Sequence, residues 1–370
     1  MQLIRMEISG VRNLSSTSID CSSGLNLFIG PNGAGKTAIL EAVHLLARGQ
    51  SFRSKSAEPV IQHGSDSLMV RARFDDEHRG LVAAGIIKHR GNRTELRLNE
   101  APEKRLSELA RLMPIQLILP NSSDLVFGPP IERRRFIDWG TFHVEHAFLE
   151  QLRDYQRVLQ QRIALLRSFQ GQSTRALEGE LGVWTRRLVE LGLCVDSARR
   201  VYLSSLVPVI RKKLEALSLT VNLDLSYRSG WREGLSLEDS LRDGVARDVK
   251  FGLTHSGPHR GDLRLSVEGD SAAATLSRGQ AKVVASALRL AQAEITNTVG
   301  GRRSLFLIDD VGAELDATHS ERFFRALEET GSQVLATATS ATPLSSAFEG
   351  RGRQLFHVER GSCHPIDTRE

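Results

Sequence analysis

The eight residues from Gly30 to Thr37 constrain the fold of this chain more than any other segment. They read Gly-Pro-Asn-Gly-Ala-Gly-Lys-Thr, which is the pattern of a phosphate-binding loop. An apolar run at 25–29 precedes the loop, and residues 38–47 after it read as a buried helix. Because strand, glycine loop and helix is the context that such a loop needs, the sequence predicts an α/β fold that binds ATP or a close relative.

The residue types of the loop indicate how it would hold a nucleotide. Successive backbone N–H groups point into a concavity that accepts phosphate oxygens, and the following helix N-terminus adds to it. Lys36 is expected to reach the β- and γ-phosphates, and the Thr37 hydroxyl to ligate Mg²⁺. The expected nucleotide-binding residues are Gly30, Pro31, Asn32, Gly33, Ala34, Gly35, Lys36 and Thr37.

A second motif, Leu-Phe-Leu-Ile at 305–308 followed by Asp309 and Asp310, resembles a Walker B strand. A short continuous apolar run is typical of a strand buried on both faces. Such a strand would deliver Asp309 beside the nucleotide as a ligand of Mg²⁺. Asp310 would then orient or deprotonate the attacking water. The alternative is a strand end followed by a turn with two solvated aspartates.

A third motif, Leu-Ser-Arg-Gly-Gln at 276–280, resembles the signature of ABC-type ATPases. Small residues at a helix N-terminus, here Ser277 and Gly279, can make a second phosphate-binding surface. In that family the surface faces the nucleotide held by the other subunit, which implies an ATP-dependent homodimer. The family also places Asp316 at the D-loop position. The alternative is an ordinary helix with Ser277 as its N-cap.

Within the ABC class the chain is similar to the SMC-like branch, and above all to the RecF family of bacterial repair ATPases. Phe-Arg-Ser at 52–54, the Arg-rich block at 132–140 and a Gly-Pro-His-Arg segment within 256–262 carry this resemblance. The resemblance extends from about Leu3 to about Thr339. It implies an ABC-type P-loop ATPase head, with an α/β lobe and a mainly helical second lobe.

The resemblance also implies boundaries and a further site residue. The ATP-binding α/β lobe would comprise 1–117 and 298–370, and the helical lobe with the signature motif would comprise 118–297. Gln116 would be the Q-loop glutamine that links the nucleotide to lobe rotation, with Lys36 and Asp310 as its partners in catalysis.

The function implied by the family is ATP-driven homodimerisation on DNA during recombinational repair and the processing of replication gaps. Partners would be duplex DNA with gapped or single-stranded junctions, and the RecO and RecR proteins that promote recombinase loading. Asp310 replaces the usual catalytic Glu, and no His follows the expected strand at 334–337, so Thr337 or Thr339 would take that position. Both departures indicate a weak, DNA-stimulated ATPase that acts as a switch.

The net charge of +5 permits a nucleic-acid partner without requiring one. Arg133, Arg134 and Arg135 lie on one expected helix, so at most two of them can face one phosphate track. The third is expected to pair with Glu132 or Asp138. The other basic candidates for phosphate contacts are Arg71, Arg73, Lys88, His89, Arg90, Arg93, Arg186, Arg187, Arg199, Arg200, Arg211, Lys212 and Lys213.

The remaining patterns concern location and the other elements. The 3 Cys lack a Cys-x-x-Cys spacing and no apolar run of about 18 residues occurs, so we expect a cytoplasmic protein that does not enter a membrane. Apolar stripes at 148–166 and 177–202 predict two short helices folded back on each other. Further strands are expected at 3–8, 70–74, 81–88, 93–98 and 333–337. Alternative functions are an ABC transporter's ATP-binding subunit, a small-molecule kinase and a DNA-binding protein with a vestigial nucleotide site.

Overall fold

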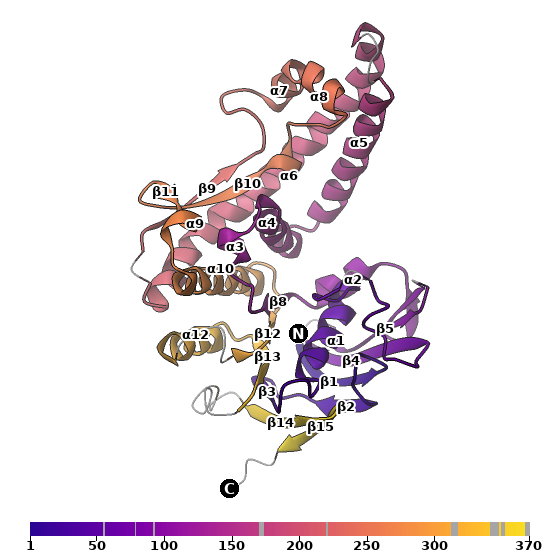
Figure 1. The fold of residues 1–370 in the computed structure, drawn as a ribbon, viewed down its shortest axis with the longest axis vertical. Coiled ribbons are helices and arrows are strands. Elements are labelled where there is room, and N and C mark those ends of the chain that lie inside the picture. Colours follow the sequence, from indigo (N-terminus) through magenta and orange to yellow (C-terminus); the bar gives the residue numbers. More distant parts are fainter. Residues whose placement is uncertain are drawn as a thin grey trace. The chain divides into compact units, whose positions relative to one another are not determined.

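The computed structural model forms two compact units (Figure 1). The first comprises Met1–Ser122, Lys213–Leu219 and Lys282–Glu370, and the second comprises Ser123–Lys212 and Thr220–Ala281. The structure describes residues 1–54, 56–77, 79–91, 93–169, 174–219, 221–311, 317–340, 348 and 352–366, without the side chains of 174–178 and 317–318.

The first unit contains a largely parallel sheet with the order β15-β14-β3-β13-β12-β8. Only β15 runs antiparallel to its neighbour. Every residue of β12 and β13 is buried, which explains the continuous apolar sequence of β12, while the polar Gln333 and Thr337 of β13 form internal hydrogen bonds. The strands are β3 (Leu25–Ile29), β8 (Ile115–Ile118), β12 (Leu305–Ile308), β13 (Gln333–Ala338), β14 (Arg353–Glu359) and β15 (Ser362–Ile366).

An antiparallel sheet with the order β2-β1-β4-β5-β6-β7 lies in the same unit. In β4, buried residues alternate with exposed ones such as Arg71 and Arg73, so one face of the sheet is packed and the other is solvated. The strands are β1 (Gln2–Ser9), β2 (Thr17–Asp20), β4 (Ser67–Asp76), β5 (Gly80–His89), β6 (Thr94–Leu98) and β7 (Ala101–Glu103).

Helix α1 (Lys36–Arg48) packs between these two sheets, since it contacts β4 and β5 of one and β13 of the other. It follows the glycine loop directly and ends at Gly49, whose φ of 67° is the left-handed conformation typical of a helix C-cap. Its apolar residues are buried and join one core with both sheets. The first unit also holds α2 (Leu106–Leu112) and α12 (Ala317–Glu329).

The second unit combines helices with a three-stranded antiparallel sheet of order β11-β10-β9. Two helices, α6 and α10, begin in this unit and end in the first. The helices are α3 (Asp124–Phe127), α4 (Pro130–Val144), α5 (Phe148–Ser168), α6 (Thr174–Ala216), α7 (Leu237–Asp243), α8 (Val245–Phe251), α9 (Ala272–Thr275) and α10 (Arg278–Thr298), with a 3-10 turn at Pro258–Arg260. The strands are β9 (Leu223–Arg228), β10 (Asp262–Val267) and β11 (Asp270–Ser271).

The α/β fold class expected from the sequence is confirmed, as are the strands expected around the glycine loop and in the antiparallel sheet. The helical pair at 148–166 and 177–202 is present, but its second member, α6, has 43 residues and continues to Ala216. Buried Leu206, Ile210 and Leu214 extend its apolar face beyond the predicted end. The boundaries at 117/118 and 297/298 between the ATP-binding lobe and the helical lobe stay a prediction.

Candidate functional site

The glycine loop runs from the end of β3 to the start of α1, as the sequence predicts. Gly30 leaves β3 so close to β14 that a Cβ on it would overlap the carbonyl oxygen of Val358. Gly35 has a φ of 115°, a conformation that side chains other than glycine rarely adopt. The loop therefore depends on glycine at these positions for both space and backbone angle.

Lys36 points back into this loop. Its ammonium group donates to the carbonyl oxygens of Gly30 at 2.7 Å and Pro31 at 2.9 Å, and the residue is buried. Burial lowers the pKa of Lys36, while the nearby carboxylates of Asp310 and Asp309 act in the opposite direction. A buried ammonium inside a concave loop is a point charge suited to phosphate oxygens.

Thr37 and Asp309 meet across the parallel sheet, although 272 residues separate them in sequence. The Thr37 hydroxyl lies 2.9 Å from Asp309 Oδ1 and 3.2 Å from Oδ2. Thr337, at the end of β13, donates to Asp309 Oδ1 at 2.8 Å and accepts the backbone N–H of Asp310 at 2.8 Å. Since parallel strands end at one edge, β12 and β13 bring these oxygens beside the loop.

Asp310 follows immediately and is exposed. Its φ of 56° is unusual for a residue other than glycine, although aspartate tolerates it better than most. Non-glycine residues in this region cluster at functional sites, because the surrounding contacts must hold them there. Here the hydrogen bond from Asp310 N to Thr337 is such a contact.

These residues fit a nucleotide with a magnesium ion. The hydroxyl of Thr37 and the carboxylate of Asp309 are hard oxygen ligands of the kind Mg²⁺ takes, and they already lie within hydrogen-bond distance of each other. The loop presents a buried Lys36 and a glycine-dependent concavity for phosphate groups. When bound, the ion would neutralise charge on the phosphates, and the loop N–H groups would hold their oxygens.

Two contacts of the loop were not foreseen from the sequence. Asn13 donates from its side chain to the carbonyl oxygen of Gly33 at 3.1 Å, and the N–H of Gly361 donates to the carbonyl of Ala34 at 2.9 Å. Asn13 lies 20 residues before Gly33, whereas Gly361 comes from the turn between β14 and β15. The loop is thus fixed from two sides by the N-terminal segment and the β14–β15 turn.

Gln116, whose Q-loop role stays a prediction, lies inside the parallel sheet. It is fully buried within β8 and lies opposite Phe306 of β12. Phe306 is three residues before Asp309 in the sequence. Its side chain donates to Gln292 Oε1 of α10 at 3.2 Å and lies 3.5 Å from Arg289 Nη1. The structure thus joins Gln116 to α10, the helix that starts at the signature motif, rather than to Lys36 or Thr37.

Ser277 and Gly279 belong to the second unit and are exposed. Ser277 caps α10 reciprocally with Gln280: the Gln280 N–H donates to Ser277 Oγ at 3.2 Å, and the Ser277 N–H donates to Gln280 Oε1 at 2.9 Å. No side chain crowds Gly279, since a Cβ there would meet only Ser277 Oγ at 4.0 Å among described atoms. Ser277 can therefore cap α10 while the helix N-terminus at Gly279 stays open to an anion. Asp316 of the D-loop lies outside the described residues.

The Arg-rich block and the Gly-Pro-His-Arg segment bind each other. Arg133 makes a two-pronged ion pair with Asp262 at 2.8 and 3.0 Å, and Arg134 donates to the Gly261 carbonyl at 2.7 Å. Arg135 pairs with Glu132, which confirms that expectation. Contact of Arg133 or Arg134 with a phosphate track stays a prediction, and in the structure Asp262 pairs with Arg133 while Arg134 donates to one backbone carbonyl.

His259 of this segment is also internal. Its Nδ1 lies 2.6 Å from the Tyr155 hydroxyl, and its Nε2 lies 2.9 Å from the Thr254 carbonyl oxygen. Burial lowers the pKa of His259 to about 4, so the ring is neutral at physiological pH. A neutral ring that donates a hydrogen bond from Nε2 can accept a hydrogen bond from the Tyr155 hydroxyl at Nδ1.

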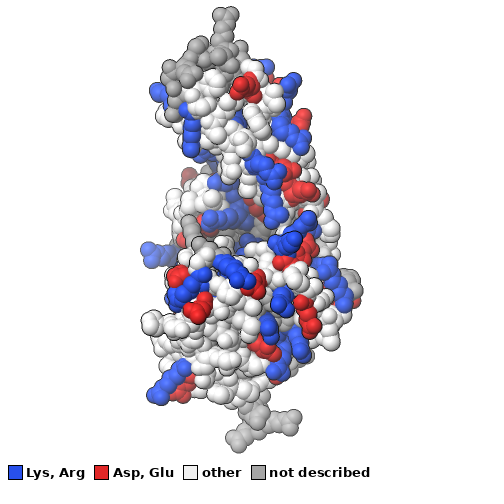
Figure 2. All heavy atoms as spheres, turned by 90° about the vertical axis from the view of Figure 1, so that its right-hand side faces the viewer, with Lys and Arg blue, Asp and Glu red and all other residues white. Residues whose placement is uncertain are grey.

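Most of the other basic candidates are paired as well. Carboxylates within the same unit hold His89, Arg90, Arg93, Arg187, Arg199, Arg200 and Lys213. Figure 2 shows Lys and Arg interspersed with Asp and Glu over the face it presents, without one continuous basic surface. Within the described residues, no helix is both long and apolar enough to cross a bilayer.

Sequence comparisons give a consistent family. The model of the RecF/RecN/SMC N-terminal domain matches residues 2–361. A DNA replication and repair protein RecF from Marinomonas sp. (strain MWYL1) is 38% identical over 338 residues, which cover 91% of this chain and 90% of that protein. Its namesake from Shewanella denitrificans is 37% identical over 367 residues, which cover 99% of this chain and 100% of the relative.

Solved structures share the fold. A structure of the recombination mediator protein RecF with ATP, from the RecFOR pathway, superposes with a TM-score of 0.86 at 23% identity and covers 99% of this chain and 97% of that one. An Smc head bound to the C-terminal winged-helix domain of ScpA reaches a TM-score of 0.61 at 15% identity, covering 99% and 97%.

Proposed function

The chain belongs to the RecF/RecN/SMC N-terminal domain family and, within it, to the RecF proteins, and we propose that it is an ATP-dependent DNA-binding protein of replication and repair. The observation that carries the nucleotide part is the meeting of Lys36, Thr37 and Asp309 at one edge of the parallel sheet. Lys36 and the loop glycines would bind the phosphates of ATP. Thr37 and Asp309 would hold Mg²⁺.

ATP would join two copies of the chain. Ser277 and Gly279 form an exposed helix N-terminus that is free of crowding, which suits the phosphates of a nucleotide held by a second copy. The lobes 1–117 with 298–370 and 118–297 would turn relative to each other as the pair closes. The contact of Gln116 with α10 supports a role for Gln116 in this motion, because α10 starts at the signature motif.

Hydrolysis would be slow and would release the pair. Asp310 would orient or deprotonate the attacking water, and its side chain is one methylene shorter than the usual glutamate. Thr337 would act where related ATPases place a histidine, since it touches Asp309 and orders the backbone of Asp310. The resulting activity is a weak ATPase that DNA would stimulate.

The names of the relatives support the choice of partners. Curated relatives are named for DNA replication and repair, and the solved RecF is named as a recombination mediator of the RecFOR pathway. We propose duplex DNA next to gapped or single-stranded segments as the ligand, with RecO and RecR as protein partners and recombinase loading as the outcome. An ATP-binding subunit of a transporter is not favoured, because the matching family is that of RecF, RecN and SMC proteins.

Sedimentation with and without Mg-ATP tests this proposal. The wild-type chain is expected to dimerise only with the nucleotide, while Lys36→Arg and Ser277→Arg should each stay monomeric. Lys36→Arg keeps the charge but replaces a point-like ammonium by a planar group that the loop does not fit. Dimerisation of either variant as strong as that of the wild type would contradict the composite site.

A further inference from the structure

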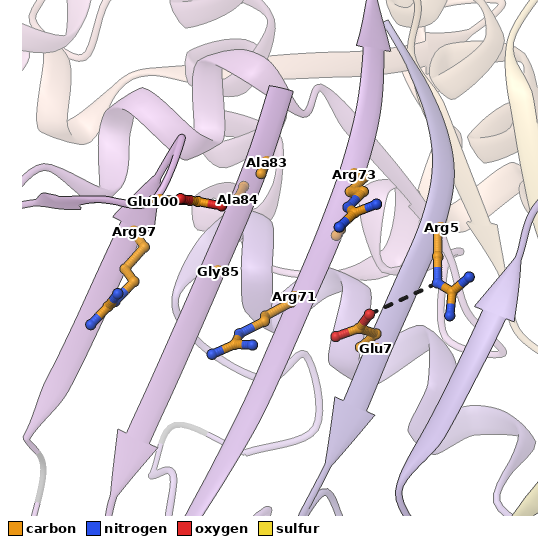
Figure 3. A pocket seen from close by; sticks show the side chains of 10 residues that line it. Arg5, Glu7, Arg71, Arg73, Ala83, Ala84, Gly85, Arg97 and Glu100 are labelled. Carbon is orange, nitrogen blue, oxygen red and sulfur yellow. Dashed lines mark ion pairs between the residues drawn. The ribbon is translucent and has the colours of Figure 1, made fainter. Parts of the chain in front are cut away.

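Four arginines from three strands surround a hollow on the solvated face of the antiparallel sheet (Figure 3). They are Arg5 on β1, Arg71 and Arg73 on β4, and Arg97 on β6. The hollow has a volume of about 290 Å³. We call these four residues and the space between them the arginine hollow.

Strand register explains how this site arises. Arg73 lies opposite Arg5, whereas Arg71 lies opposite Gly85, which in turn lies opposite Arg97. Gly85 has no side chain, so Arg71 and Arg97 flank an open floor, as Figure 3 shows. A Cβ on Gly85 would meet nothing closer than Arg71 Cγ at 3.5 Å. The space is therefore present because glycine occupies the middle strand.

The arginine hollow carries a net positive charge, because its lining contains four arginines and two carboxylates, Glu7 and Glu100. Arg71, Arg73 and Arg97 are exposed, and among the described residues their guanidinium groups have no ion-pair partner. Arg5 pairs with Glu7 at 3.8 Å and with Asp20 at 3.5 Å, and Glu7 also lies opposite Arg71 in the register of β1 and β4. This distinguishes the hollow from the paired arginines elsewhere on the chain.

We propose that the arginine hollow binds the sugar-phosphate backbone of DNA. This inference rests on the proposed function and adds the place where the DNA would lie. Arginines two residues apart on a strand are about 6.6–6.8 Å apart, and strands lie about 4.8 Å from one another. Phosphates of one DNA strand advance about 3.4 Å per nucleotide along the axis, so several arginines can each engage a different phosphate of one backbone.

The lining also indicates how the DNA would be read. Among the described residues that line the hollow, none is aromatic, so the site offers no platform for base stacking. Phosphate contacts from arginine position a duplex without reading its sequence. Enclosed small-molecule sites are mostly apolar, whereas this hollow is lined mainly by charged side chains. A passing backbone fits these features better than an enclosed ligand.

A triple variant, Arg71→Gln, Arg73→Gln and Arg97→Gln, tests the site in the full chain with Mg-ATP. Binding of a labelled random-sequence duplex is measured by fluorescence anisotropy across about 50 to 200 mM salt. Loss of three phosphate contacts should weaken binding by about tenfold or more at 0.1 M salt and reduce the salt slope by about 2.7. Mg-ATP-dependent dimerisation should stay, because these residues lie outside the nucleotide site, and it verifies folding.

The matched control removes the same charge elsewhere. Arg157, Arg187 and Arg325 are exposed, and each pairs with a carboxylate one helical turn away. Their replacement by Gln should change affinity by no more than about threefold, since distant exposed charges are screened. Equal affinity of the two triple variants would overturn the inference.

A second pair of variants places a charge on the floor of the hollow. Gly85→Glu and Gly85→Gln have nearly the same shape, and a Cβ is tolerated there. Gly85→Glu should bind DNA much more weakly than Gly85→Gln, because its carboxylate repels phosphate. Equal binding by the two would contradict a phosphate site.

The outcomes separate this inference from the proposed function. Wild-type chain without salt-dependent DNA affinity would contradict the proposed function itself. DNA binding by the wild type that the hollow variants leave unchanged would overturn only the inference. If those variants lost binding to poly-glutamate but not to DNA, the hollow would be a site for an acidic protein segment and the DNA assignment would be wrong.

Discussion

At the scale of single residues, Thr337 has the most informative position in the candidate site. Its hydroxyl donates to Asp309, the proposed ligand of Mg²⁺, and accepts from the backbone of Asp310, the residue proposed to orient water. Replacing Thr337 by valine removes the hydroxyl but keeps the size of the side chain, so it tests these two hydrogen bonds without a change in packing. Thr337 therefore links the metal ligand to the hydrolytic residue.

Thr337→Val is expected to weaken Mg-ATP binding by about tenfold, because the Asp310 N–H loses its acceptor and such losses cost about 1–3 kcal/mol. Titration of the chain with a fluorescent ATP analogue in the presence of Mg²⁺ measures the change. Thr141→Val is the control, since Thr141 is equally buried and its hydroxyl donates to Ile137 within α4. A comparable loss in both variants would show a general packing effect.

At the scale of elements, the second unit joins its helices through a buried charge network. Arg162 of α5 is fully buried and donates to Asp248 of α8 at 2.8 Å and to Thr254 at 2.7 Å. Asp248 also accepts from the backbone N–H of His255 at 3.0 Å. Because burial makes an unpaired charge costly, the pairing of α5 with α8 depends on both partners.

Asp248→Asn is expected to destabilise the second unit by about 3–5 kcal/mol, because the Arg162 charge stays buried without its counter-charge. Tryptophan fluorescence during urea unfolding reports on this unit alone, since Trp139, Trp184 and Trp231 all lie in it.

Asp154→Asn provides the contrast, since it breaks an exposed pair with Arg157 within α5 and should cost less than about 1 kcal/mol. An unfolding midpoint of Asp248→Asn close to that of Asp154→Asn would show that the buried pair adds little.

Local elements could be predicted because their signals are local. The apolar strand, the glycine loop and the buried face of α1 identify one another within 24 residues, from Leu25 to Arg48. Partners distant in sequence could not be predicted in the same way. The pairing of Arg133 with Asp262 spans 129 residues, and the approach of Arg97 to Arg71 depends on the register of β5 between them.

The end of α6 shows a different limit. Pro208 lies inside this helix, and a proline in a sequence usually indicates a helix end. The helix continues because buried leucines and Ile210 on both sides of the proline keep one apolar face. Tertiary packing therefore outweighs the local signal at this point.

At the scale of the whole molecule, the proposed site is divided between two copies of the chain. Lys36 belongs to one unit and Ser277 to the other, and each copy would contribute one of them to each shared nucleotide. Two copies would then form two equivalent sites. A mixture of one variant changed at Lys36 and another changed at Ser277 would therefore still form one intact site per pair.

Mixing Lys36→Ala with Ser277→Arg is expected to restore Mg-ATP-dependent association that neither variant shows alone. In the mixed pair one site carries both changes, while the other combines an intact Lys36 with an intact Ser277. Sedimentation of the mixture, with one variant labelled, detects the pair. If the mixture stayed as monomeric as its components, each site would be built within a single chain.

The strand order of the parallel sheet has a consequence for synthesis on the ribosome. β3 leads into the glycine loop near the start of the chain, yet its two neighbours, β13 and β14, begin only at Gln333 and Arg353. Translation proceeds from the N-terminus, so β3 and its loop emerge long before anything can pair with them. The turn at Gly361, which holds Ala34, emerges later still. Nascent chains would thus gain the capacity to bind ATP only near the end of translation, well after the second unit can fold.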